Sequence, residues 1–161
     1  MRLKFDIKEI EGLSGEKAHV YSVQLKGENE TLLEQFFDEN SKYGTDLKEI
    51  FNKLCLMGRE TGCRRQWFKM NEGCPGDGVA ALWYGQLRLY CLYFDKTAVF
   101  FGSGGYKPPQ AHAYEEVPEL NAKAQQMKEI AKRINQAIID KDIVINEDGE
   151  LTINDWDDEE D

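Results

Sequence analysis

Residues 86–118 carry cations and aromatic rings at a spacing that could serve binding or catalysis. Arg88 and Tyr90 alternate with apolar residues, so in a strand both side chains would leave the same face. Tyr106 and Lys107 follow a glycine-rich corner and precede two prolines. A guanidinium and an ammonium side by side can hold an anionic group. We therefore predict that Arg88 and Lys107 face one groove.

His112 lies in the loop after these prolines. Imidazole exchanges protons near neutral pH, so His112 is a candidate acid or base, although a lone loop histidine is more often a surface residue. His19 is expected to be structural. The cations also have simpler explanations, because Arg88 could pair with Asp95 and Lys107 could be an ordinary turn lysine. The sequence leaves these alternatives open.

A second cationic group lies in residues 64–69. The alternation there predicts a strand, with Arg65, Trp67 and Lys69 on one face and Arg64 on the other. Two cations beside an aromatic ring make this trio the more plausible binding surface. Alternatively, Trp67 packs in the core and the arginines are simply solvated.

The chain is acidic as a whole, with a formal net charge of -10 over 161 residues. This balance argues against a general nucleic-acid binder. The charge is uneven, however. Residues 59–107 hold seven bases against four acids, whereas residues 147–161 hold nine acids and no lysine or arginine. The middle of the chain is therefore locally basic, and the cations there call for a functional explanation.

Length and composition predict a single domain, 1–153, followed by a disordered acidic tail, 154–161. No stretch reaches the roughly 18 apolar residues of a membrane helix. The N-terminus alternates and carries acids, unlike a signal peptide. We therefore expect a cytoplasmic protein that does not bind membranes.

The four cysteines have no C-x-x-C spacing, which argues against a zinc site. We expect free thiols, no metal and no cofactor. Cys55 and Cys91 lie in apolar runs and are expected in the core. Cys63 and Cys74 flank a polar strand and are expected to be more exposed.

The order of expected elements predicts an α+β fold with an antiparallel sheet of about four to six strands. The core spans residues 19–139, and a small hairpin covers residues 143–153. Thr31 is the expected N-cap of the first helix, Gly44 should break it, and residues 102–105 should end a strand. The expected strands cover residues 2–10, 19–25, 64–70, 79–83, 87–94, 97–101, 144–145 and 151–153, and the expected helices residues 32–41, 45–59 and 118–139.

The chain resembles the RelE/ParE toxin superfamily, in particular its phage-derived, HigB-like branch, over roughly residues 19–139. Leu87-Arg88-Leu89-Tyr90 looks like the arginine strand of that family. Residues 100–118 look like its strand that ends in an aromatic-x-lysine corner before a proline and the last helix. The chain differs in its acidic balance, its added N-terminal strand, C-terminal hairpin and tail, and a single lysine where many relatives have two.

The resemblance implies a RelE-like fold and a type II toxin that cleaves mRNA on the ribosome without a metal. A cognate antitoxin would neutralise it. RNA cleavage by its own 2′-hydroxyl needs a base, an acid and cations on the phosphate. On this interpretation Arg88 clamps the phosphate, while Lys107 adds a charge or a proton. Tyr90 or Tyr106 would stack on a base or donate a proton, and His112 would be an acid or base.

The same resemblance implies a role for the upstream group. Arg64, Arg65 and Lys69 would follow the RNA backbone, and Trp67 would stack on a base. The alternative is a non-catalytic protein-binding module on the same fold, which the acidic balance and the lack of a clear general base favour. A further hypothesis is that residues 155–161, with Trp156 as an anchor, fold over the basic groove.

Overall fold

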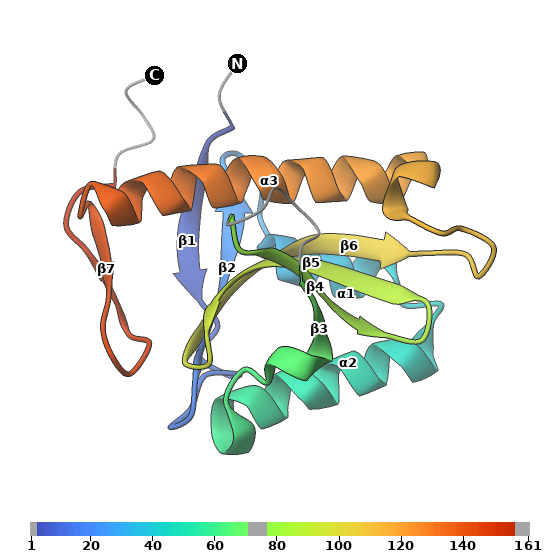
Figure 1. The fold of residues 1–161 in the computed structure, drawn as a ribbon, viewed down its shortest axis with the longest axis horizontal. Helices are drawn as coiled ribbons and strands as arrows, with labels where there is room; N and C mark the ends of the chain where they lie inside the picture. The colour runs from blue at the N-terminus through green and yellow to red at the C-terminus, as the bar shows by residue number, and fades with distance from the viewer. Residues whose placement is uncertain (1–2, 71–76, 157–161) are drawn as a thin grey trace.

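The computed structural model describes residues 3–70 and 77–156 and places a sheet between two layers of helices (Figure 1). The strands of the sheet are β1 (Phe5–Glu9), β2 (His19–Leu25), β3 (Phe68–Lys69), β4 (Val79–Tyr84), β5 (Leu87–Asp95) and β6 (Ala98–Tyr106). The helices are α1 (Leu32–Glu39), α2 (Gly44–Leu56) and α3 (Pro118–Ile139). A separate hairpin follows α3 and consists of β7 (Ile143–Ile145) and β8 (Leu151–Ile153).

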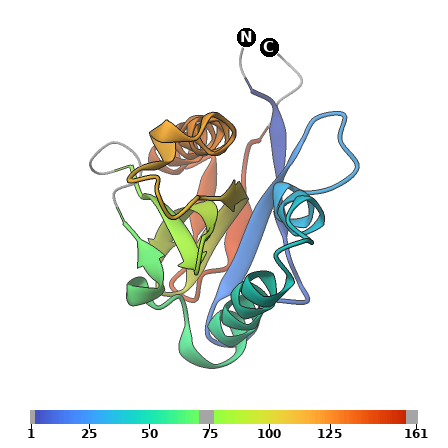
Figure 2. The same ribbon diagram turned by 90° about the vertical axis from the view of Figure 1, so that its right-hand side faces the viewer.

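The sheet has the strand order β1-β2-β6-β5-β4-β3. Helices α1 and α2 cover one face and α3 covers the other, as Figure 2 shows. The predicted mixture of helices and strands is confirmed, but the expected purely antiparallel sheet is wrong, because β2 and β6 run parallel. Alternation along a strand shows which side chains share a face. It does not encode which distant strand becomes the neighbour, or its direction.

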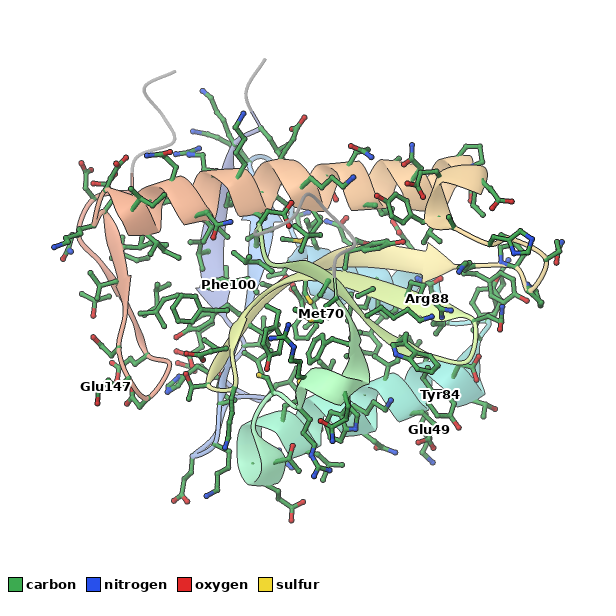
Figure 3. All side chains as sticks on the ribbon, viewed as in Figure 1. Glu49, Met70, Tyr84, Arg88, Phe100 and Glu147 are labelled. Atoms are coloured by element: carbon green, nitrogen blue, oxygen red, sulfur yellow. The ribbon has the colours of Figure 1, made fainter. Side chains whose placement is uncertain are left out.

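Each face of the sheet has its own core, because side chains alternate along the strands. In β5, Leu89 and Cys91 pack toward α1 and α2, whereas Tyr90 and Leu92 pack toward α3. Phe100 of β6 lies fully buried on the α3 side of the sheet, to the left of the middle in Figure 3. Burial on both faces explains why β5 and the first part of β6 read as nearly continuous apolar runs.

Some helix boundaries follow directly from the sequence. Thr31 caps α1 as predicted: its hydroxyl accepts a hydrogen bond from the Glu34 N–H at 3.2 Å, and the Glu34 carboxylate accepts one from the Thr31 N–H at 2.9 Å. Helix α3 begins and ends where expected. Gly44, however, is the first residue of α2, and α2 continues into a π-helical turn, Met57–Thr61.

Strand β6 runs through residues 102–105, where the prediction ended the strand. Gly104 makes this possible, because a Cβ there would lie 1.9 Å from the Arg88 carbonyl oxygen of β5. The register between β5 and β6 also shifts at this point, between Leu89 and Cys91. The glycine corner therefore allows two strands to approach closely, and it brings the end of β6 beside Arg88.

The C-terminal hairpin is tied to the sheet through one buried hydroxyl. Tyr21 Oη donates to the Gly149 carbonyl oxygen at 2.8 Å and accepts from the Leu151 N–H at 2.9 Å. Tyr21→Phe removes both bonds, and we expect it to lower the free energy of unfolding by about 1–3 kcal/mol. Urea unfolding and amide exchange at Leu151 would measure this loss. Tyr84→Phe, which removes a hydroxyl from an exposed side chain, is the matched control; equal losses in the two variants would contradict the assignment.

Trp156 ties the segment after the hairpin to the β1 edge of the sheet. Its indole N–H donates to the Phe5 carbonyl oxygen at 3.0 Å, and the Arg133 guanidinium lies 4.5 Å from its ring centroid. Trp156, which we expected in a disordered tail, thus has defined contacts, whereas residues 157–161 lie outside the described residues. In Figure 1 this end of the described chain is by the C-terminal end of α3, away from the β4–β5 hairpin. The described part of the tail therefore does not cover the predicted groove.

Candidate functional site

Three cations from three different elements lie around the Trp83 side chain of β4. The distances to its ring centroid are 5.6 Å for Arg88 Cζ, 5.0 Å for Lys69 Nζ and 5.7 Å for Lys53 Nζ. A cation within about 6 Å of an aromatic face is attracted by the ring quadrupole. We call these four side chains the Trp83 cluster. Figure 3 shows Arg88 on the β4–β5 hairpin, between α3 and α2 in that view.

Strand register explains why Lys69 and Arg88 meet at Trp83. Trp83 pairs directly with Arg88 between β4 and β5, and Lys69 of β3 pairs with Ala81. Ala81 is two residues from Trp83, so Lys69 lies on the same face and one step away. On the other side, Arg88 pairs with Gly105 of β6. Lys69, Trp83, Arg88 and Gly105 therefore form one row across β3, β4, β5 and β6, on the face of the sheet that carries α3.

Arg88 is held in one position by the turn of its own hairpin. Its Nη1 donates to the Gly85 carbonyl oxygen at 2.8 Å and to the Leu87 carbonyl oxygen at 3.0 Å. The side chain is only 7% exposed. The alternative of a pair with Asp95 receives no support, because that carboxylate accepts hydrogen bonds from Thr97 at the other end of β5. A guanidinium fixed in this way can hold an anion without first being ordered.

Lys107 and His112 meet beyond the end of β6. The Lys107 N–H donates to the Gln86 carbonyl oxygen at 2.7 Å, and the Gln86 side-chain amide donates to the Lys107 carbonyl oxygen at 2.6 Å. Gln86 lies just before β5 and two residues before Arg88, so the β5–β6 register, continued by one pair, places Lys107 and Arg88 on the same face. The Lys107 ammonium donates to the His112 carbonyl oxygen at 3.2 Å. The His112 side chain is exposed, and its backbone N–H donates to the Glu116 carboxylate at 2.9 Å. Continued register therefore agrees with a common face for Arg88 and Lys107, and that the two side chains share one groove stays a prediction.

The two predicted tyrosines do not lie at this surface. Tyr90 is fully buried under α3, and its ring packs edge-on against Tyr114. Tyr106 points to the opposite face of the sheet and stacks on Tyr43, with ring centroids 4.6 Å apart. The predicted stacking of either ring on a base is therefore not supported. For Tyr106 the reason is strand alternation: Leu87 and Arg88 lie on opposite faces of β5, and Arg88 faces α3. Tyr106 of β6 pairs with Leu87, so its side chain faces away from α3.

The predicted trio Arg65, Trp67 and Lys69 is separated in the structure. Arg65–Trp67 forms a 3-10 turn, and only Phe68–Lys69 is strand, so the alternation expected over residues 64–70 fails. Arg65 lines a cavity at the far end of β5, whereas Trp67 lies between the Arg64 guanidinium at 5.8 Å and the Lys53 ammonium at 5.7 Å. Of the trio, Lys69 alone belongs to the Trp83 cluster.

Sequence reasoning missed Lys53 and Trp83. Lys53 lies in an amphipathic helix and Trp83 ends an apolar strand, so neither stands out by type or spacing. The available signal was the hairpin: Trp83 and Arg88 flank the tight turn at Gly85, which places them opposite each other. Nothing in the sequence indicates that α2 brings Lys53 to the same ring.

Other candidate sites in the described residues are separate from the Trp83 cluster. Within residues 3–70 and 77–156, no group of three or more histidines, cysteines or carboxylates is placed to hold a metal ion. No helix in that part of the chain has the length and apolarity needed to span a membrane. One cavity of about 580 Å³ is lined by Arg65, Lys96 and Asn135, and another of about 310 Å³ lies beside Tyr43 and Tyr106.

Two thiols are buried beneath the α1–α2 side of the sheet. Cys91 was expected there, but Cys63, expected nearer the surface, is only 1% exposed, and Cys74 lies outside the described residues. Burial raises the pKa of Cys63 to about 12 and that of Cys91 well above its usual value. Both thiols are therefore protonated and unreactive at neutral pH, which argues against a nucleophilic role.

The raised pKa of Cys63 predicts a loss of stability in alkali. Above pH 9.0 the unfolded thiol loses its proton while the folded one keeps it until about pH 12, so stability falls as pH rises through this window. The free energy of unfolding of wild type minus that of Cys63→Ala should change little below pH 9 and fall by about 1.4 kcal/mol per pH unit above it. Urea unfolding of both proteins at pH 8, 9 and 10 would measure it, and a constant difference would contradict the prediction.

The geometry suits an anionic ligand at the Trp83 cluster, because a fixed guanidinium and an exposed lysine lie against the same ring. The Lys107 loop continues this surface beyond β6. Among known proteins no counterpart was found: no protein-family model, no curated protein and no solved structure matches the chain.

Proposed function

We propose that this protein is a RelE/ParE-type toxin of the HigB-like branch that cleaves mRNA on the ribosome and is neutralised by a cognate antitoxin. The observation that carries the proposal is the row of cations along one face of the sheet. Lys69 and Arg88 lie against Trp83, and register adds Lys107 on the same face. Such a row suits a chain of phosphates, with or without a defined base sequence.

The proposed reaction is internal transesterification of RNA, which needs no metal. The 2′-oxygen attacks the adjacent phosphorus, the bond from phosphorus to the 5′-oxygen breaks, and the products carry a 2′,3′-cyclic phosphate and a 5′-hydroxyl. A base takes the proton of the 2′-hydroxyl, and an acid protonates the 5′-oxygen. Arg88 would stabilise the charge on the pentavalent phosphate. Lys107 and His112 would supply the acid and the base; the Lys107 ammonium donates to the His112 backbone carbonyl oxygen, which places both residues in one loop.

A non-catalytic protein-binding module is the second candidate. Apolar side chains are exposed on the α2 side of the molecule: Phe51 is 47% and Leu56 37% exposed. Phe51 also packs on Phe37 of α1, with ring centroids 6.0 Å apart. An apolar surface of this kind suits a helical partner. It is also compatible with the first proposal, in which the partner is the antitoxin.

Primer extension on a reporter mRNA in a cell-free translation system tests the proposal. The proteins compared are wild type, an Arg88→Ala/Lys107→Ala variant, and a control in which two exposed lysines on α2 and α3 are replaced, Lys48→Ala/Lys132→Ala. We expect cuts with wild type and the control only, and only while the mRNA is translated. No cuts by folded, partner-free wild type at any dose would favour the binding module. Equal cutting by the Arg88→Ala/Lys107→Ala variant would show that the site is elsewhere.

A further inference from the structure

We infer that Lys53, with the rings of Trp67, Trp83 and Tyr84 around it, forms a second phosphate site for single-stranded RNA. This site shares Lys53 and Trp83 with the Trp83 cluster and extends it to Trp67 and Tyr84. The inference rests on the proposed function, because it takes the ligand to be the RNA strand that crosses Arg88. It adds a binding site on helix α2, which the pattern of residues in the sequence does not indicate.

Three aromatic rings from two elements surround the Lys53 ammonium. Its Nζ lies 5.7 Å from the Trp67 centroid, 5.7 Å from the Trp83 centroid and 5.4 Å from the Tyr84 centroid. The ammonium also donates to the Trp83 carbonyl oxygen at 3.2 Å. Figure 3 shows Tyr84 by the α2 ribbon in that view, below Arg88. Lys53 is thus held in place without a carboxylate.

Strand β3 does not extend along β4 as far as Trp83, where Lys53 reaches the strand. Strand β3 pairs with β4 only at Leu82 and Ala81, so Trp83 lies beyond the last β3 pair. Tyr84 and Leu87 form the pair that closes the β4–β5 hairpin. The direction of backbone hydrogen bonding alternates along an antiparallel strand, so the N–H and C=O groups of Trp83, one residue earlier, point away from β5. Within the described residues, the Lys53 ammonium therefore binds a carbonyl oxygen on the outer edge of β4 that β3 does not reach, and it marks where an extended ligand could pass from one face of the sheet to the edge.

The partners of Lys53 hold its position and leave its charge unneutralised. An aromatic ring attracts a cation through its quadrupole but carries no net charge. Burial lowers the pKa of Lys53, and the nearby Glu49 charge opposes this only in part. Within the described residues no carboxylate forms an ion pair with this ammonium. A phosphate placed against it would restore the electrostatic stabilisation that burial removed.

Three other cations of the described residues also lie near these rings. Arg64 lies against Trp67, and Lys69 and Arg88 lie against Trp83. Asp46 of α2 faces the turn, where a Cβ on Gly85 would meet its carboxylate at 2.5 Å. Lys53 Nζ and Arg88 Cζ can be no more than about 11 Å apart, since they lie 5.7 and 5.6 Å from the same ring centroid. One short stretch of RNA can therefore contact both cations.

The test uses a fluorescent single-stranded RNA octamer with 2′-O-methyl groups, which cannot be cleaved by its own 2′-oxygen. Binding is measured by anisotropy at several salt concentrations for wild type, Lys53→Met, Lys53→Arg and Lys48→Met. Lys48 is an exposed lysine of the same helix and is the matched control. Lys53→Met should bind the octamer more weakly. The slope of the logarithm of its binding constant against the logarithm of the salt concentration should be smaller in magnitude by about 0.7, the value for one phosphate contact on a single strand. Lys53→Arg and Lys48→Met should keep the wild-type slope.

A second measurement uses wild type alone, and it tests the Lys53 site even if Lys53→Met does not fold. The Lys53 side chain, followed by NMR, should titrate below its usual pKa in the free protein. Its pKa should rise when the octamer binds, because a phosphate favours the charged form. No rise on binding, or a Lys53→Met slope equal to that of wild type, would overturn the inference.

The two proposals fail in different ways. Binding of the octamer that depends on Lys53, together with no cleavage of ordinary mRNA in translation, would retain the site and remove the nuclease proposal. If Lys53→Met leaves both mRNA cleavage and the salt dependence of octamer binding unchanged, the nuclease proposal stands and the Lys53 site is excluded. No binding of the octamer to wild type at low salt would overturn the Lys53 site.

Discussion

Arg88→Met is expected to lower the rate of mRNA cleavage by about 10²–10³, the usual effect of removing one fixed donor from a developing negative charge. The guanidinium is held before any ligand arrives, through bonds to the carbonyl oxygens of Gly85 and Leu87. Methionine keeps the apolar stem beside Trp83 and removes the charge. The rate would be measured from the accumulation of cut mRNA in a translating extract.

Arg88→Lys separates charge from geometry in the same assay. Lysine keeps one positive charge but cannot make two parallel hydrogen bonds to a phosphate. We expect a rate between those of wild type and Arg88→Met. Because Arg88 is buried and bonded to its own turn, the melting temperature of each variant must be measured as well. A folded Arg88→Met protein that cuts as fast as wild type would remove Arg88 from the mechanism.

Gly104→Ala is expected to lower the free energy of unfolding by about 3 kcal/mol, the upper end of the range for overpacked cores. A Cβ at this position would lie 1.9 Å from the Arg88 carbonyl oxygen, so β5 and β6 would have to separate. Urea unfolding followed by tryptophan fluorescence would measure the loss. Since Arg88 is the strand neighbour that must move, RNA cleavage should fall as well.

Gly105→Ala is the matched control for this prediction. A Cβ at Gly105 would meet only the Leu120 side chain, at 3.6 Å, which is an ordinary contact. The two glycines are adjacent in the same strand, and neither has a positive φ. A loss of less than about 1 kcal/mol is expected for Gly105→Ala. Equal losses in the two variants would indicate a general preference for glycine there, and not the close approach of β5.

The predicted elements that matched the structure depend on interactions between residues close in the chain. The Thr31 cap, the bounds of α3 and the C-terminal hairpin are set by neighbours within a few residues. The hairpin of β4 and β5, which was not predicted, places Arg88 opposite Trp83 through interactions that are equally local. The 3-10 turn at Arg65–Trp67 shows the limit, because alternating residue types alone do not make a strand.

The sequence by itself determined which residue types could bind an anion, and it placed Arg88 and Lys107 at positions that neighbouring strands bring to one face. The tertiary structure decided that Tyr90 is buried, that Tyr106 stacks on Tyr43, and that Lys69, Arg88 and Lys53 lie around the Trp83 ring. The physical reason is the range of the interactions. Capping, alternation and turns act over a few residues, whereas the parallel pairing of β2 with β6 and the packing of α2 beside β4 join segments far apart in the chain.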